Sequence, residues 1–358
     1  EDGRVTCWAS SQGGHNYRDD VAKALGLEQS DVRVHVKDIG GGFGAKGSVS
    51  EEEVMVAQLA RLTGRPVRWT ESRTENLIGY VHGRAQKQWV TMGGTRDGRI
   101  TTYRLEVVQD CGAYPLWGPF LPEFTRQMAC GVYDIAEVEY SAKSVATNTA
   151  PVTAYRGAGR PEATAAIERA VDMFAAEIGM DPAEVRRINL IPSDSFPFTT
   201  RTGTSYDSGE YETALDAALE AVDYTSLRAE QQHRRETGDR QQMGIGVATY
   251  VEITGFGGSE YGEVKLRSDG TFLATTGTTN IGTGHATTWA MIVADRLGVP
   301  MDQVEVFQGD TDLVPSGDTT AGSRSVQLAG SAMADASEKL VEVARQAAAD
   351  QLEAAVAD

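Results

Sequence analysis

The sequence predicts an α+β fold in which a β-α-β unit occurs twice and the sheets are mixed. The first copy reads as a strand, a helix and a strand, at residues 4–10, 16–25 and 32–36. The second copy repeats this order at residues 271–279, 287–297 and 304–307. Alternating apolar and polar residues predict further strands between the copies. An internal duplication with strands of both kinds therefore underlies the predicted fold class.

The two copies share their turns and their helix ends, since Gly26 and Gly298 are predicted to end the two helices. A glycine turn follows the first strand of each copy, as Gln12-Gly-Gly-His15 and as Gly282-Thr-Gly-His285. Each copy is then followed by a loop of small residues and a helix, at residues 40–61 and 319–351. Because duplicated halves commonly place a ligand between them, these loops are expected to face one cleft. The histidines at matching positions are interpreted as structural.

The middle of the chain is predicted to contain β structure first and helices later. Alternation predicts strands at residues 66–69, 86–92, 100–109 and 138–145, and residues 113–126 read as irregular. Apolar spacing predicts helices at residues 161–178 and 211–235, and a third that Asp181 caps. Further strands are expected at residues 243–250 and 261–267. Residues 191–206 read as a linker, so the predicted domains are residues 1–195 and 196–358.

Composition excludes several classes of partner. The chain has 358 residues and a net charge of −18, which argues against nucleic acid and anionic membrane surfaces. No stretch is long and apolar enough to span a bilayer. Three isolated cysteines, Cys7, Cys111 and Cys130, lack metal-ligand spacing and suit a reducing compartment, so a cytoplasmic location is expected. The five histidines are also scattered, and no side-chain metal site is predicted.

Residues 40–44 read Gly-Gly-Gly-Phe-Gly and lie between a predicted strand and a predicted helix. Glycines let the backbone lie against a ligand, and a following helix that Ser48 or Ser50 caps offers N–H groups to an anion or cofactor. Gly47 follows Lys46, so the loop is not a P-loop, and it lacks the dinucleotide spacing. A plain strand-to-helix turn is the alternative.

A second glycine loop, at residues 154–161, surrounds Arg156. Its flanking glycines expose the guanidinium and the backbone amides together, which suits an oxyanion or a phosphate. A structural arginine that bridges loop carbonyls is the alternative. Gln12, at a strand end, is interpreted as a donor to a ligand oxygen or as a turn amide. Phe43 is interpreted as a core residue by default, or as a ring that lies on a ligand.

Taken together, these segments resemble the molybdenum-binding large subunit of the xanthine dehydrogenase, aldehyde oxidase and aerobic carbon monoxide dehydrogenase family. The likeness lies in the loop at residues 38–46, the arginine loop at 149–162, and the segments 309–312 and 322–325. It covers nearly the whole chain. The resemblance implies a molybdenum cofactor-binding domain and a cofactor that carries its own metal, either molybdopterin or its cytosine dinucleotide form. Cytoplasmic molybdenum oxidoreductases of this kind hydroxylate a small substrate with oxygen from water.

The resemblance also implies roles for individual residues. Gln12 and Arg156 would take the catalytic positions. The cofactor-binding positions would be Gln12, Gly42, Phe43, Gly44, Arg156, Gly157, Gly282, Thr283, Gly284, Gly322, Ser323 and Ser325. Among them, Ser323 and Ser325 would bind the pterin phosphate, although helix caps are the alternative. No side chain would bind molybdenum directly. Iron–sulfur clusters and FAD are expected on partner subunits of an oligomeric full-length protein.

Departures from the family pattern narrow the expected substrate. The carbon monoxide-oxidising branch has a cysteine where this chain has Gly157, which argues against carbon monoxide. Purine oxidisers have a glutamate and a phenylalanine where this chain has Gly47 and Ala158, so these two line a roomy pocket in the expected site. An aldehyde or an N-heterocycle is the expected substrate. Thr283 replaces a usual glutamine.

The family's catalytic glutamate lies in a motif that is not found in these 358 residues. The base is therefore expected outside the chain, which reads as an internal part of a longer protein and is expected to be inactive alone. The alternative function is a catalytically inactive duplicated scaffold for subunit assembly.

Overall fold

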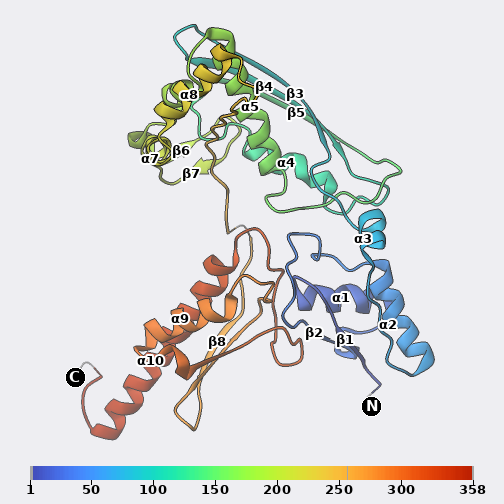
Figure 1. Ribbon diagram of the computed structural model, residues 1–358. Coiled ribbons are helices and arrows are strands. Elements are labelled where there is room, and N and C mark those ends of the chain that lie inside the picture. Colours follow the sequence, from blue (N-terminus) through green and yellow to red (C-terminus); the bar gives the residue numbers. More distant parts are fainter. Residues whose placement is uncertain (1–2, 256, 357–358) are drawn as a thin grey trace. The chain divides into compact units, whose positions relative to one another are not determined.

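The computed structural model describes residues 3–255 and 257–356. The chain forms two compact units: the first combines Glu1–Leu77 with Ile253–Asp358, and the second is Ile78–Glu252. Both copies of the β-α-β unit therefore lie in the first unit, although they are far apart in the sequence (Figure 1). The domain boundary at residue 195, which lies in the linker predicted at residues 191–206, stays a prediction.

The duplication of a β-α-β unit is confirmed. The first copy consists of β1 (Val5–Trp8), α1 (Gly14–Leu25) and β2 (Val32–His35). The second consists of β9 (Phe272–Thr276), α9 (His285–Leu297) and β10 (Val304–Phe307). The two strands of each copy pair in parallel, and β8 (Gly262–Leu266) joins β9 in antiparallel. The predicted α+β class with mixed sheets follows from these pairings.

Each copy buries one face of its helix against its own strands. In the first copy, Val21 and Ala22 of α1 are buried in one cluster with strand valines. In the second copy, Trp289 and Val293 of α9 are fully buried in a corresponding cluster. Both helices end, as predicted, at a glycine in the left-handed region, Gly26 with φ 65° and Gly298 with φ 67°. Equivalent sequence signals thus produce equivalent local structures.

The two copies are joined edge to edge beyond β2. The Val36 N–H donates to Gly309 O at 2.7 Å, and the Thr311 N–H donates to Val34 O at 3.1 Å. Ion pairs reinforce this junction. They link Arg33 with Asp310 at 2.7 Å, and Arg4 with Asp312 at 2.6 Å. The duplicated halves therefore form one unit with a shared seam.

A helix follows each copy. In α2 (Glu51–Thr63), Ser50 is the N-cap: its Oγ accepts from Glu53 N, and the Glu53 carboxylate accepts from Ser50 N at 2.8 Å. Of the two predicted caps, Ser48 and Ser50, the structure therefore has Ser50. The other helix is α10 (Ser331–Leu352), preceded by a π-helical turn at Val326–Gly330. Both helices begin directly after the loops that the sequence singles out.

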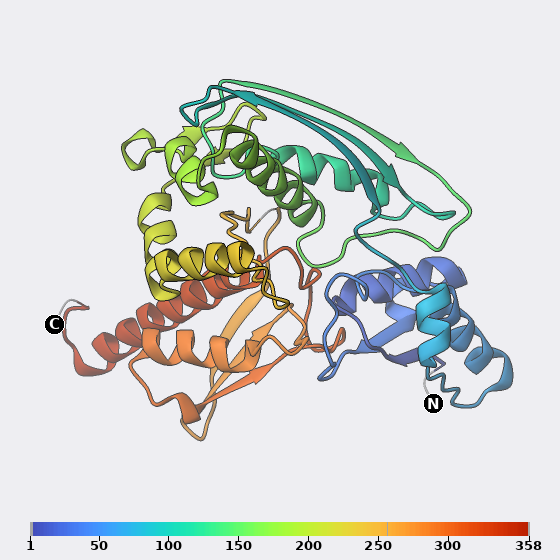
Figure 2. The same ribbon diagram turned by 45° about the horizontal axis from the view of Figure 1, so that its top comes forward.

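The second unit is built on a mixed three-stranded sheet. Its strands are β3 (Gln86–Gly94), β4 (Ile100–Asp110) and β5 (Glu137–Val145), in the order β3-β4-β5. β3 and β4 are antiparallel, and β4 and β5 are parallel. The long helix α5 (Arg160–Ile178) lies along the sheet (Figure 2). Ile167 and Val171 of α5 are buried against Tyr103, Leu105 and Val107 of β4.

A buried ionic network fixes the helices beside this sheet. Arg186, in α6 (Pro182–Asn189), has no exposed surface and pairs with Glu168 at 2.8 Å and with Asp172 at 2.9 Å. Burying charges is costly unless they are paired, so these partners are mutually dependent. Asp181 caps α6 as predicted, by accepting from Ala183 N at 2.8 Å.

Some predicted elements are wrong. Residues 66–69 form no strand, and the chain instead forms α3 (Arg73–Gly79) shortly afterwards. The stretch at 113–126, predicted irregular, contains α4 (Leu121–Gln127). The linker at 191–206 contains a small hairpin, β6 (Phe198–Thr199) with β7 (Ser205–Tyr206). Alternation and composition show which residues turn inward, but they do not show whether a partner strand is available.

Two further corrections concern the end of the second unit. The helix predicted at 211–235 is two helices, α7 (Tyr211–Ala221) and α8 (Tyr224–Thr237), because Asp223 takes φ 48° and breaks the helix. Residues 243–250 form no strand. Side chains bind this segment instead: the Thr249 N–H donates to Glu168 at 3.0 Å, and Gln231 donates to Met243 O at 3.0 Å. These donors and acceptors replace the strand partner that the alternation suggested.

The seam of the first unit is predicted to weaken in acid. Burial raises the pKa of Asp310, but hydrogen bonds from Arg33 and the Asp312 N–H outweigh it and lower this pKa. The hydrogen bond from Arg4 is the main cause of the lowered pKa of Asp312. Because both folded-state pKa values lie below the ordinary 3.8, the stabilisation is complete above about pH 4 and is lost as pH falls through them.

The substitution Asp310→Asn tests this dependence. At pH 7 it should lower the local unfolding free energy of β2 by about 1–3 kcal/mol, because Arg33 loses a charged acceptor. The deficit should be smaller at an acidic pH below 3.8, as the wild-type carboxylate becomes protonated. Hydrogen exchange of the β2 amides as a function of pH measures it, with exposed Asp302→Asn as the control. A deficit that is the same at both pH values would contradict the prediction.

Candidate functional site

The candidate site in the first unit is built around the side chain of Gln12, which is only 2% exposed. Its Oε1 accepts from the Gly44 N–H at 2.9 Å and from the Lys46 N–H at 3.2 Å. Its Nε2 donates to Thr320 O at 2.8 Å. One amide therefore ties the first-copy glycine loop to the second-copy loop. A carboxamide nitrogen has two hydrogens, and the second has no partner among the described residues.

The backbone of Gln12 strengthens the same junction. Gln12 O accepts from the Thr320 N–H at 2.8 Å and from Thr279 Oγ1 at 2.6 Å. The Gln12 N–H donates to Lys46 O at 2.9 Å. Thr279 and Thr320 are both buried, and the sequence did not predict them as site residues. Their only signal is a polar residue just beyond a strand or within a small-residue loop, and that signal is too common to single them out.

The glycine loop lies so close to Gln12 that side chains are excluded. A Cβ on Gly42 would lie 2.5 Å from the Gln12 side chain, a distance that real Cβ contacts do not reach. Phe43 adopts φ 55°, in the left-handed region that a bulky residue rarely takes. Its ring is not in the core: the residue is 50% exposed, so the default core interpretation is wrong.

The second-copy turn lies beside the start of that loop. Asn280 donates to Asp38 at 2.8 Å and accepts from the Gly282 N–H at 3.2 Å. Gly282 and Gly284 have φ 88° and 76°, and Gly284 is the N-cap of α9. Thr283 lies between them and is exposed. The glycine turns of both copies thus lie in one unit and are connected through side chains.

The loop at 322–325 completes this set. Ser323 has φ 52°, and Ser325 immediately precedes the helical segment that leads into α10. Neither hydroxyl has a hydrogen-bond partner within the part of the chain that the structure describes. Arg324, between them, turns inward and pairs with Asp318 at 2.8 Å. Arg324 is thus buried, whereas Ser323 is exposed and Ser325 is half-buried.

The two histidines after the glycine turns are buried, in line with a structural role. His15 contacts Val314 O through Nε2 at 2.8 Å. Burial is the main cause that lowers the pKa of His15 and of His285 below its ordinary value. Within residues 3–255 and 257–356, no three His, Cys, Asp or Glu side chains gather as metal ligands. The described loops offer backbone amides, hydroxyls and a carboxamide instead.

The arginine loop belongs to the second unit. Gly157 and Gly159 have φ 91° and 83°, and Ala158, with φ 44°, is a non-glycine residue in the left-handed region. The Ala158 N–H donates to Tyr155 O at 2.7 Å, which closes a tight turn just before α5. A Cβ on Gly157 would lie 2.4 Å from Pro161. This backbone leaves Arg156 exposed at the tip of the loop.

The structure therefore divides the predicted site residues into two groups. The first unit contains Gln12, Gly42, Phe43, Gly44, Gly47, Gly282, Thr283, Gly284, Gly322, Ser323 and Ser325. The second unit contains Arg156, Gly157 and Ala158. The contacts described above link Gln12 with the glycine loop, and that loop with the second-copy turn. The meeting of the two groups at one cofactor stays a prediction.

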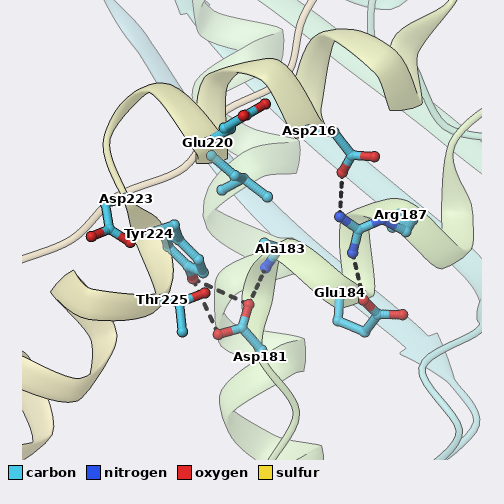
Figure 3. A pocket seen from close by; sticks show the side chains of 10 residues that line it. Asp181, Ala183, Glu184, Arg187, Asp216, Glu220, Asp223, Tyr224 and Thr225 are labelled. Atoms are coloured by element: carbon cyan, nitrogen blue, oxygen red, sulfur yellow. Dashed lines mark hydrogen bonds and ion pairs between the residues drawn. The ribbon is translucent and has the colours of Figure 1, made fainter.

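A cavity of about 540 Å³ in the second unit lies between α6, α7 and α8 (Figure 3). Its charged lining is mainly acidic: Asp181, Glu184, Asp216, Glu220 and Asp223. Arg187 pairs there with Glu184 and Asp216. The Tyr224 hydroxyl donates to Asp181 at 3.1 Å. No predicted site residue lines this cavity, so it is a crevice between helices and not the candidate site.

Two family profiles, each described as a molybdopterin cofactor-binding domain, match residues 1–190 and residues 217–358. The chain belongs to the molybdopterin cofactor-binding domain family. This is the family of the molybdenum-binding large subunits of xanthine dehydrogenase and carbon monoxide dehydrogenase, as the sequence resemblance indicates. Its members with these names are molybdenum oxidoreductases.

Individual relatives cover nearly all of the chain. It is 39% identical to the carbon monoxide dehydrogenase large chain of Hydrogenophaga pseudoflava, over 98% of this chain and 46% of that one. It is 32% identical to the nicotine 6-hydroxylase large subunit of Paenarthrobacter nicotinovorans, over 95% of this chain and 44% of that one. The chain therefore spans about half the length of the curated relatives it matches.

Solved structures share the fold. Cu,Mo-containing carbon monoxide dehydrogenase matches with a TM-score of 0.91 and 34% identity, over 99% of this chain and 47% of that chain. Quinoline 2-oxidoreductase from Pseudomonas putida 86 matches with a TM-score of 0.92 and 32% identity, over the same shares. Both scores agree with the α+β fold. No helix among the described residues is long and apolar enough to cross a membrane.

The residues of the first unit fit a molybdopterin cofactor. Gly42 is buried against the Gln12 side chain and leaves no room for a Cβ, so the glycine loop packs directly on that amide. Gln12 retains an N–H for a ligand oxygen, and Ser323 and Ser325 offer hydroxyls without a protein partner in the described chain. Such a donor set suits a cofactor that carries its own metal and presents oxygen atoms to the protein.

The close approach of Gly42 to Gln12 generates a prediction. In Gly42→Ala the new Cβ displaces the Gln12 side chain, so the Gly44 and Lys46 amides lose their acceptor. Their protection against hydrogen exchange should fall by about 1–3 kcal/mol. Gly40→Ala is the matched control, because a Cβ there meets nothing within 4 Å. Equal protection in both variants would show that the Gly42 contact is unimportant.

Proposed function

We propose that the full-length protein containing this chain is a molybdenum hydroxylase, and that this chain holds most of its cofactor site. The observation that carries the proposal is the junction at Gln12, where side-chain-poor loops from both copies are bonded to one buried amide. A turn alone would not need a buried side chain that binds two loops and still has one N–H without a partner among the described residues. Membership of the molybdopterin cofactor-binding domain family supports this reading.

The reaction that we propose is hydroxylation of a small aldehyde or N-heterocycle with oxygen from water. When bound, the molybdenum cofactor would supply the two-electron redox chemistry. The relatives named nicotine 6-hydroxylase and quinoline 2-oxidoreductase support an N-heterocycle. Gly157 stands where the carbon monoxide-oxidising branch resembled by this chain has a cysteine, so carbon monoxide is not the proposed substrate.

Each group in the chain has a distinct task in this proposal. Gln12 donates its remaining N–H to an oxygen of the cofactor, while its other contacts keep that N–H in place. Gly42, Phe43 and Gly44 present backbone groups, and Ser323 and Ser325 bind the phosphate together with the start of a helix. Arg156 brings a fixed positive charge to the edge of the site, where charge develops on oxygen during the reaction.

Partners and the remaining catalytic parts lie outside this chain in the proposal. Electrons leave to iron–sulfur and flavin subunits, and the general base is a glutamate in another region of the full-length protein. The 358 residues alone are accordingly proposed to be inactive. The proposed cofactor is molybdopterin or its cytosine dinucleotide form.

Arg156→Ala in the full-length holoenzyme tests the proposed site. Turnover should fall by about 10²–10³-fold, because a positioned charge is lost, while the molybdenum content per chain stays at the wild-type level. Metal analysis and substrate oxidation measure the two quantities. Arg96→Ala, at an exposed hairpin turn of the same unit, is the control and should leave both unchanged.

The outcomes separate the candidate functions. Wild-type turnover in the Arg156→Ala enzyme would refute the assigned site. Wild-type protein that contains no molybdenum, when isolated from cells that supply the cofactor, would refute the hydroxylase proposal and favour the scaffold alternative.

A further inference from the structure

The segment before β3 runs alongside the chain that leads into the arginine loop. The His82 N–H donates to Pro151 O at 2.9 Å, and the Thr153 N–H donates to His82 O at 2.8 Å. A Cβ on Gly83 would lie 2.6 Å from the Tyr155 Cβ, so the two backbones approach as closely as a glycine permits. The two segments thus form one continuous ridge in the second unit, with the arginine loop at its end.

Arg84 continues this contact with its side chain. Its guanidinium donates to Tyr155 O at 3.1 Å and also to Arg156 O. The guanidinium carbon lies 5.2 Å from the centre of the Tyr155 ring, within the range of a cation–π interaction. The planar fork of an arginine can bind two neighbouring carbonyls at once, which an ammonium cannot do. Arg84 therefore holds the two peptide groups on either side of the Arg156 Cα.

The Arg84 backbone is itself held in an unfavourable conformation. Its φ of 63° lies in the left-handed region, which a long side chain rarely adopts. Such strain persists where the surrounding contacts determine the conformation. Here those contacts are the bonds from His82 to the neighbouring segment and the carbonyls that Arg84 binds. The strained Arg84 backbone is thus stabilised by the same contacts that join it to the arginine loop.

A buried carboxylate keeps the guanidinium in place. Glu162, in the first turn of α5, has a side chain that is 6% exposed, and its Oε2 lies 3.5 Å from Arg84 Nη1. Neither of its carboxylate oxygens has a hydrogen-bond partner among the described residues. The nearby Arg160 is engaged elsewhere, since it pairs with Glu252 at 3.2 Å and donates to Gly157 O at 2.6 Å. Arg84 thus forms an ion pair with Glu162, and the charge of Arg160 also acts on this carboxylate.

We propose that Arg84 is a positioning residue for Arg156, and that Glu162 holds Arg84 in place by charge. This inference rests on the proposed function, because it assumes that Arg156 serves the reaction. Arg84 fixes the backbone on both sides of Arg156, so the exposed guanidinium of Arg156 projects in one direction. The guanidinium of Arg84 binds the two carbonyls and Glu162. Arg84 therefore affects the reaction only by holding the arginine loop.

The test uses the full-length holoenzyme with Arg84→Ala, Arg84→Lys and a control. The control Arg104→Ala removes an exposed ion pair with Glu139 from the sheet of the same unit. In Arg84→Ala, kcat should fall about 10²-fold and KM should change less than about 3-fold, because a misplaced Arg156 affects the reacting geometry more than substrate binding. Arg84→Lys should keep the charge but not the fork, and lose about 10-fold in kcat.

Two readouts do not depend on turnover. Molybdenum content should equal that of the wild type in all three variants. Hydrogen exchange of the peptide covering residues 153–160 should be faster in Arg84→Ala and unchanged in Arg104→Ala. Faster exchange with a lower kcat supports the proposal. Unchanged exchange in Arg84→Ala overturns it, and so does faster exchange with wild-type kcat.

The carboxylate is tested by a double-mutant cycle. Glu162→Gln should lower kcat in the same direction as Arg84→Ala, and the double variant should be no worse than Arg84→Ala alone, because both act through one guanidinium. Additive losses would overturn the role given to Glu162. If the wild-type protein contains no molybdenum, the proposed function fails, yet the exchange measurement still reports whether Arg84 holds the loop.

Discussion

The hydrogen bonds of the Gln12 side chain are the contact on which the rest of the first unit depends. A buried carboxamide destabilises the folded state when its N–H groups and oxygen lack hydrogen-bond partners, because the free-energy cost of removing them from water is then not offset. In this chain the partners come from both copies of the duplicated unit, so satisfying one amide brings the glycine loop and the second-copy loop together. The requirement for Gly42 follows directly, because a Cβ would occupy the place of the amide.

Backbone strain marks the same regions of the chain. Six non-glycine residues among those described have positive φ, and three of them, Phe43, Ala158 and Ser323, are predicted site residues. A fourth, Arg84, binds the arginine loop. Strained conformations cost free energy and persist where surrounding contacts determine them. Their concentration in the glycine loops suggests that these loops are shaped for a ligand as well as for connecting elements.

The sequence predicts those helix ends and caps that depend on one or two neighbouring residues. The helix stops at Gly26 and Gly298, the cap at Asp181, and Ser50 as one of two possible caps were predictable. The structure of residues 243–250 was not predicted correctly, because their partners are the side chains of Glu168 and Gln231 and not a neighbouring strand. The exposure of Phe43 was not predicted either, because the sequence does not show that this residue takes a left-handed backbone conformation.

The candidate site shows the same limit. Glycine-rich loops could be located from the sequence, and a family resemblance supplied their roles. The bond from Gln12 to Thr320 spans 308 residues, and no local signal indicates it. The same holds for Arg84, which lies 72 residues before the carbonyl of Arg156 that it binds. Contacts of this kind depend on how the chain folds back, so they require the three-dimensional structure.

The most direct test of the central claim is the molybdenum and pterin content of full-length protein with Gln12→Glu. A glutamate can still accept from the Gly44 and Lys46 amides, but its carboxylate has no N–H for Thr320 O or for a cofactor oxygen, and it brings a charge into a buried site. The account predicts that cofactor content falls at least about 10-fold relative to wild type while the protein remains folded. Wild-type cofactor content in folded Gln12→Glu protein would contradict it.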